Sequence, residues 1–211
     1  MNAVQANSRR WWTLSPLFGS LVFIVLYTMA AAFYPGGSQA DAHAKGFSWM
    51  HNYWCNLLNE KALNGESNAA RPFAWTAMAI LLLSLLCFWA VATQGLLSSR
   101  TLKNTAFFSG TASVLLLPFL PTGFHDVIIN TSGLFGLVAL LLVYRGLYKN
   151  AWHKLFAFGM VNLVLIALNN YLYYGASFYC LPLVQKVTFA SFLLWICLVT
   201  VKLYRHPKGQ A

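Results

Sequence analysis

The residues best suited to chemistry lie between Pro121 and Gly136, where a polar segment leads into a long apolar run. His125 and Asp126 open this run, and Asp126 is one of only four acidic residues in the sequence. On a helix, Asn130 shares a face with Asp126 because the two are four residues apart. Ionisable groups inside a membrane are costly unless they are partnered, so this polar entry into an apolar helix is the first candidate for a functional site.

Other polar residues fall at a similar depth in later apolar runs. Lys186 lies about five residues into the last run, roughly 7 Å along a helix. A pair between Asp126 and Lys186, with amides taking up the remaining hydrogen bonds, would suit a zwitterionic or phosphate-bearing headgroup. We therefore predict that a lipid headgroup or small amphiphile binds at a set of polar residues: Asp126, His125, Asn130, Asn169, Asn170, Lys186 and Arg71.

A packing role for the same residues stays open as an alternative. Asp126 can cap its helix and interact favourably with the helix dipole. Lys186 can extend its ammonium group toward the membrane surface. The asparagines can join neighbouring helices by hydrogen bonds, and a pair of small residues such as Ser132 and Gly136 lets a second helix approach closely.

An enzymatic alternative rests on metal ligands. His51, His125 and Asp126 are of the types that zinc takes in proteins, and they would serve a metal-dependent membrane hydrolase. However, the sequence contains no HExxH motif, and none of its serines lies in a GxSxG context. We therefore expect neither a catalytic set nor a cofactor, and the hydrolase remains the alternative to a binding protein.

Composition defines the surroundings of these residues. Of 211 residues, 59% are hydrophobic and 9% are charged, whereas soluble domains are about one-quarter charged. The net charge of +10 comes from short basic clusters between apolar runs, which does not indicate nucleic-acid binding. Because one span needs about 20 apolar residues, the sequence predicts a single all-α integral membrane domain over 1–211, a six-helix bundle surrounded by lipids. Its predicted spans are 16–34, 72–92, 105–120, 125–144, 155–174 and 181–204.

The longest loop, residues 35–71, contains an aromatic segment. Apolar side chains from Met50 to Leu58 follow 3.6-residue spacing, which predicts an amphipathic helix over 47–63. Such a helix would lie on the membrane face. It would also offer a surface for a membrane-protein partner, so an assembly role through this loop is a further alternative.

Charge predicts the orientation. With six spans, one side of the membrane holds ten of the 14 basic residues and none of the four acidic ones. Basic residues concentrate on the cytoplasmic side, so both termini are predicted to be cytoplasmic, and the long loop and Asp126 face outward. Cys55 and Cys180 also fall on the outer side, where disulfides persist, and a bridge between them is a further candidate.

This layout resembles the DRAM/Sfk-like superfamily of six-span membrane proteins and its bacterial relatives of unknown function. The residues that carry the resemblance are His125 and Asp126 at the start of the fourth span and the segment from Ser132 to Gly136 within it. The resemblance implies a multi-pass protein of a bacterial cytoplasmic membrane. It also implies a role in lipid organisation or GPI-anchor handling, with membrane lipids as partners, rather than one defined reaction.

Overall fold

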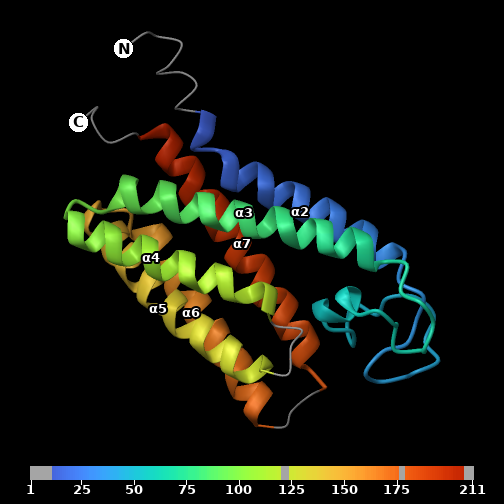
Figure 1. Cartoon of the computed structure of the whole chain (residues 1–211). Helices are drawn as coiled ribbons and strands as arrows, with labels where there is room; N and C mark the ends of the chain where they lie inside the picture. The colour runs from blue at the N-terminus through green and yellow to red at the C-terminus, as the bar shows by residue number, and fades with distance from the viewer. Residues whose placement is uncertain (1–10, 120–123, 176–178, 207–211) are drawn as a thin grey trace. The chain divides into compact units, whose positions relative to one another are not determined.

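The computed structural model describes residues 11–119, 124–175 and 179–206 of the chain. The described part is all-helical, with two isolated β-bridges and no strand. Two short 3-10 helices interrupt the connections, η1 (Trp54–Leu58) and η2 (Leu117–Phe119). The α-helices, labelled in Figure 1, are α2 (Ser15–Ala32), α3 (Arg71–Leu96), α4 (Arg100–Leu116), α5 (His125–Lys149), α6 (His153–Tyr174) and α7 (Leu181–Arg205).

Five helices of the described part are long and apolar enough to cross a membrane, namely α2, α3, α5, α6 and α7. The predicted all-α architecture with apolar helices is therefore confirmed. The predicted sixth span, 105–120, corresponds to α4, which has 17 residues and does not meet the same length and hydropathy. The reason is its polar first turns, where Arg100, Lys103 and Asn104 precede the apolar residues.

The chain divides into two compact units, and some helices contribute residues to both. Unit 1 comprises Met1–Gly19, Leu82–Phe158 and Trp195–Ala211, and unit 2 comprises Ser20–Leu81 and Gly159–Leu194. In unit 1 the helices pack closely at glycines. Trp89 of α3 lies so near Gly110 of α4 that a Cβ there would be 2.3 Å from the indole. In Figure 1, α4 runs alongside α5, so the start of α5 has a neighbouring helix on one side.

In unit 2, residues 33–70 fold at the ends of α2 and α3 (Figure 1). The amphipathic helix predicted over 47–63 is not confirmed, because this segment forms turns and only the five-residue helix η1. In this segment, asparagine side chains accept hydrogen bonds from backbone N–H groups that would otherwise bond within a helix. Asn52 Oδ1 accepts the Ser48 N–H at 2.8 Å, and Asn56 Oδ1 accepts the Tyr53 N–H at 2.7 Å. Such side-chain bonds to nearby backbone compete with helix formation.

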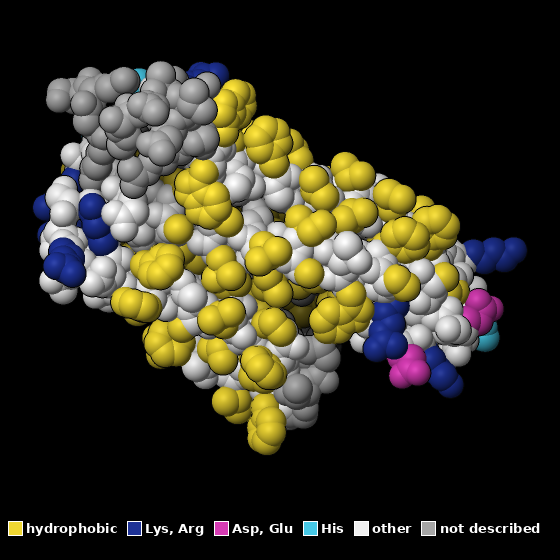
Figure 2. All heavy atoms as spheres, turned by 45° about the horizontal axis from the view of Figure 1, so that its top comes forward, with side chains coloured by type: hydrophobic (Ala, Val, Ile, Leu, Met, Phe, Trp, Pro, Cys, Tyr) yellow, Lys and Arg dark blue, Asp and Glu magenta, His cyan; other side chains and the backbone are white. Residues whose placement is uncertain are grey.

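The helix surfaces are apolar where they are exposed. Leu83 of α3, Leu134 of α5 and Val164 of α6 are each more than 60% exposed. Figure 2 shows hydrophobic side chains over much of the face turned to the viewer. Soluble monomers do not expose apolar surface on this scale, and a multi-pass membrane protein requires it.

Candidate functional site

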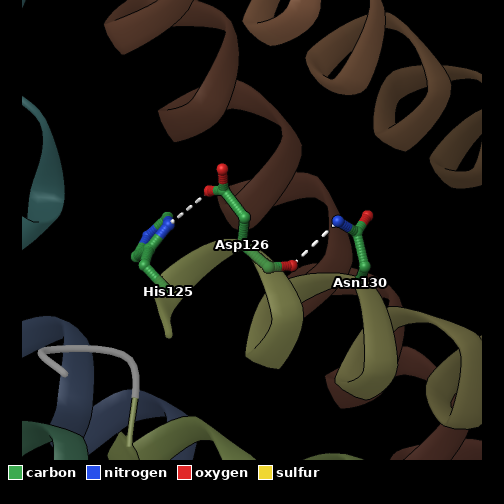
Figure 3. Close-up of polar contacts among 3 residues, drawn as sticks. All are labelled: His125, Asp126 and Asn130. Carbon is green, nitrogen blue, oxygen red and sulfur yellow. Dashed lines mark hydrogen bonds and ion pairs between the residues drawn. The ribbon is translucent and has the colours of Figure 1, made fainter. Parts of the chain in front are cut away.

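The predicted polar entry lies at the first turn of α5. His125 Nδ1 and Asp126 Oδ1 lie at a hydrogen-bonding distance of 3.0 Å, and the two side chains are 48% and 64% exposed. Asn130 Nδ2 donates to the Asp126 carbonyl oxygen at 2.8 Å. Figure 3 shows His125 and Asp126 together on the first turn of the helix and Asn130 on the next turn. The carboxylate holds Nδ1 of the imidazole, which orients Nε2 away from Asp126.

One face of α5 continues from this entry toward the middle of the helix. We call it the α5 stripe. At 3.6 residues per turn, it consists of Asp126, Asn130, Gly133, Leu137, Leu140 and Tyr144.

The stripe is buried at one end and open at the other. Tyr144 is 1% exposed and packs edge-on against Trp195 of α7, with 5.4 Å between ring centroids. Leu140 is also buried, whereas Leu137 is 41% exposed. At Gly133, no described atom outside its own helical turns would lie within 4 Å of an added Cβ. The polar half of the stripe is therefore accessible, and its apolar half leads into the core of unit 1.

The neighbouring face of α5 is closed by α4. Ser132 Oγ donates to the Ser113 carbonyl oxygen at 2.9 Å, and a Cβ added at Gly136 would lie 2.9 Å from Ser113 Oγ. The predicted close approach of a second helix at Ser132 and Gly136 is thus confirmed, and the second helix is α4. Close packing on this side fixes the rotation of α5, which in turn determines where the α5 stripe faces.

Lys186, the predicted cation of the site, lies in unit 2 under residues 33–70. It is 7% exposed, and its Nζ donates to the carbonyl oxygens of Asn52 and of Pro182, the latter at 3.0 Å. Nζ also lies 5.6 Å from the centroid of the Phe47 ring. The contact with Asn52 joins residues far apart in the chain, and no local pattern in the sequence indicates it. Asp126 belongs to unit 1, so its pairing with Lys186 stays a prediction.

The charge of Lys186 has no carboxylate partner within its own unit. The acidic residues of unit 2 are Asp41, Glu60 and Glu66, and none of them pairs with it. Burying an ammonium ion costs several kcal/mol, and each charge-assisted hydrogen bond contributes about 1.5–3 kcal/mol. The two carbonyl oxygens offset a cost of this size, but they carry no net charge to balance the ammonium group.

The other predicted ligand residues of unit 2 have different environments: one is hydrogen-bonded between helices and two are exposed. Asn169 of α6 donates to Leu165 O at 3.0 Å and to Thr188 Oγ1 of α7. It therefore joins two helices, as the packing alternative predicts. Asn170 is exposed, and Arg71 is exposed at the first position of α3.

An aromatic cluster, which sequence reasoning missed, fixes residues 33–70 to the helices of unit 2. Trp54 packs against Tyr27 of α2 at 4.6 Å and against Phe189 of α7 at 6.2 Å between centroids. The Tyr27 hydroxyl also donates to the Trp54 carbonyl oxygen at 2.9 Å. Phe47 and Trp49 extend the cluster within the segment. The density of aromatic residues between 47 and 54 was the available signal.

The cysteine bridge and the metal centre find no support in the described residues. Cys55 and Cys180 are both free and exposed in this structure, and the bridge between them stays a prediction. Cys55 is held in η1, whose residues are fixed by the aromatic cluster. Among the described residues, no group of three or more His, Cys, Asp or Glu side chains could hold a metal ion. His51 instead packs against the Tyr179 ring at 5.2 Å.

Comparisons of this chain with protein-family models, with curated proteins and with solved structures found no match.

Proposed function

We propose that this multi-pass membrane protein binds a lipid headgroup or small amphiphile along the α5 stripe. In this arrangement the polar head contacts His125, Asp126 and Asn130. The apolar part lies over Gly133 and Leu137. The protein is a binding protein in this proposal and not an enzyme.

One observation carries this proposal: a single helix face changes from polar and open to apolar and buried. The exposed carboxylate and amide lie at the start of the helix, open space follows at Gly133, and the closed core begins at Leu140. Small-molecule sites in proteins combine such an apolar surface with a few placed polar groups. An amphiphile has the same order of polarity along its length.

The proposed topology has six spans, with α4 as the sixth. The basic residues then lie on one side, and the positive-inside rule makes that side, with both termini, cytoplasmic. The start of α5 and residues 33–70 face outward, so the ligand enters from the outer leaflet of a bacterial cytoplasmic membrane. This role agrees with the one that the resemblance to the DRAM/Sfk-like superfamily implies. Asn169, Asn170, Lys186 and Arg71 stay predicted members of the site.

Native mass spectrometry of the protein purified from membranes tests the proposal by counting bound lipid. Gly133→Leu fills the open part of the stripe, and we expect it to lower lipid occupancy roughly tenfold, or about 1.4 kcal/mol. Asp126→Asn removes the charge and lowers occupancy of lipids with an amine head. Leu134→Phe is the matched control, because it adds bulk at an exposed position on another face of α5. Unchanged occupancy in both stripe variants would contradict the proposal.

A second candidate function is assembly with a membrane partner through residues 33–70. A specific observation favours it: Trp49 is 48% exposed and Met50 is 52% exposed, on a segment that the aromatic cluster holds in place. Large aromatic side chains on rigid surfaces often dominate binding energy at interfaces. Co-purification with Trp49→Ser and Met50→Ser tests it, and a partner that is retained by the double variant removes this candidate.

A further inference from the structure

The ammonium group of Lys186 has unused hydrogen-bonding capacity. A lysine carries three N–H donors, and Lys186 uses two of them, on the carbonyl oxygens of Asn52 and Pro182. Within unit 2, no carboxylate balances its charge. Backbone carbonyls are dipoles without net charge, so the buried positive charge remains uncompensated there.

A second unused donor lies in the same part of unit 2. Trp54 Nε1 is buried and has no hydrogen-bond partner among the described residues. Its indole ring lies 6.5 Å from the Phe47 ring, the same ring over which Lys186 Nζ is placed. Buried indole N–H groups normally find an acceptor. Around Phe47 there is thus a net positive charge together with donors that lack acceptors.

From this arrangement we infer a binding site for a phosphate-type anion at Lys186 and Trp54, under residues 33–70. The anion supplies the missing negative charge and accepts the free N–H groups of both side chains. Lys186 has a flexible four-carbon stem, so its Nζ can move from the Asn52 carbonyl oxygen to the anion while the helix stays in place. Phosphate presents several strong acceptor oxygens, which matches a site with more donors than acceptors.

Lys186, Trp54 and their contacts all belong to unit 2, so this inference is drawn without the α5 stripe of unit 1. The phosphate group can come from a free ion or from the headgroup of an anionic lipid. Both sources share the chemistry that Lys186 and Trp54 recognise. The experiment therefore uses both probes on the full-length protein, purified in a maltoside detergent that contains no phosphate.

Equilibrium dialysis with radiolabelled inorganic phosphate, and native mass spectrometry with phosphatidylglycerol, measure the two sources. We expect saturable binding of one molecule per chain for at least one probe. Lys186→Met should weaken anion binding at least about tenfold, because it removes the charge. Lys186→Arg should keep anion binding within about threefold of the unchanged protein, because it retains the charge but changes the geometry of the donors. Lys61→Met, which removes an exposed lysine of residues 33–70, should leave anion binding unchanged.

Trp54→Phe keeps an aromatic ring but removes the indole N–H. It tests the anion site independently if Lys186→Met does not fold. We expect Trp54→Phe to weaken binding about threefold to fivefold. Asp126→Asn keeps full binding, because the external anion balances Lys186. The inference is overturned if neither probe saturates, if Lys186→Met or Trp54→Phe binds as the unchanged protein does, or if Asp126→Asn abolishes binding. A failure here leaves the α5 proposal intact, since that proposal is measured with Gly133→Leu.

Discussion

At the scale of single residues, buried asparagines decide the structure of the longest connection. Asn68 is 5% exposed, and its Nδ2 lies 3.1, 3.2 and 2.9 Å from the carbonyl oxygens of Asn56, Leu57 and Asn59. Its Oδ1 accepts the Ala70 N–H at 3.1 Å. One side chain thus satisfies the backbone on both sides of the 59–68 turn. A polar residue in this role is hard to recognise from sequence because its acceptors are backbone atoms.

We predict that Asn68→Asp opens residues 33–70 while the helices stay folded. The change keeps Oδ1 but replaces the amide donor with a carboxylate oxygen that faces carbonyl oxygens. Loss of a buried donor costs about 1–3 kcal/mol. Limited proteolysis should cut this segment faster. Asn64→Asp is the control, because Asn64 uses only its Oδ1, on the Glu66 N–H, and an equal rate in both variants would contradict the prediction.

The pKa of the Cys55 thiol depends on the charge of Lys186. Although the Cys55 residue as a whole is exposed, burial within the loop raises the pKa of its thiol above the ordinary value, and the Lys186 ammonium opposes that rise. A raised thiol pKa keeps the neutral, unreactive form to higher pH.

We therefore predict slow alkylation of Cys55 at neutral pH in a variant that retains only this cysteine. The rate should rise as the pH passes above the ordinary thiol range. Lys186→Met should slow the reaction further, because it removes the charge that favours the thiolate. Stopped-flow alkylation across a pH series measures this, with the SDS-unfolded chain as reference. Native and unfolded chains with the same pH profile would show that the loop does not shield the thiol.

At the scale of helices, the apolar runs alone predict most of the architecture. The predicted start of α5 at His125 and the shared face of Asp126 and Asn130 agree with the structure, because both depend only on helical period. Two features could not be predicted in this way. The segment 47–63 has helical spacing, yet asparagine bonds to the backbone prevent a helix. The partners of Lys186 come from a distant part of the chain.

The two glycines of α5 allow a matched prediction about helix packing. Gly136→Val should lower the melting temperature, because the added Cβ would lie 2.9 Å from Ser113 Oγ and Ser113 of α4 would have to shift. We expect a loss of about 1–3 kcal/mol. Gly133→Val should be close to neutral, since its Cβ meets open space. Thermal unfolding in detergent compares the two, and equal loss at both positions would mean that the α5 stripe is packed.

At the scale of the whole molecule, the side of the membrane that the start of α5 faces depends on how many times the chain crosses it. The described part has five helices that qualify as spans by length and hydropathy, and α4 decides whether the number is six. With six, both ends of the chain lie on one side. Since basic residues concentrate on the cytoplasmic side of membrane proteins, the sequence predicts the sidedness of the chain more firmly than it predicts the ligand.

Labelling with a membrane-impermeant maleimide tests this topology in a cysteine-free background. Ala40→Cys, in the exposed segment between α2 and α3, should react in intact cells. Lys149→Cys, exposed at the end of α5, should react only after the membrane is permeabilised. Reaction of both variants in intact cells would place α4 outside the membrane or reverse the orientation of α5.

The central claim is that the open half of the α5 stripe holds an amphiphile. An experimental structure of the protein purified with native lipids tests it most directly. We predict elongated non-protein density that begins at Asp126 and Asn130 and passes over Gly133 to Leu137. The same map of Gly133→Leu should lack that density. A stripe that is covered by another part of the chain, or that is bare in a map with lipids resolved elsewhere, would contradict the claim.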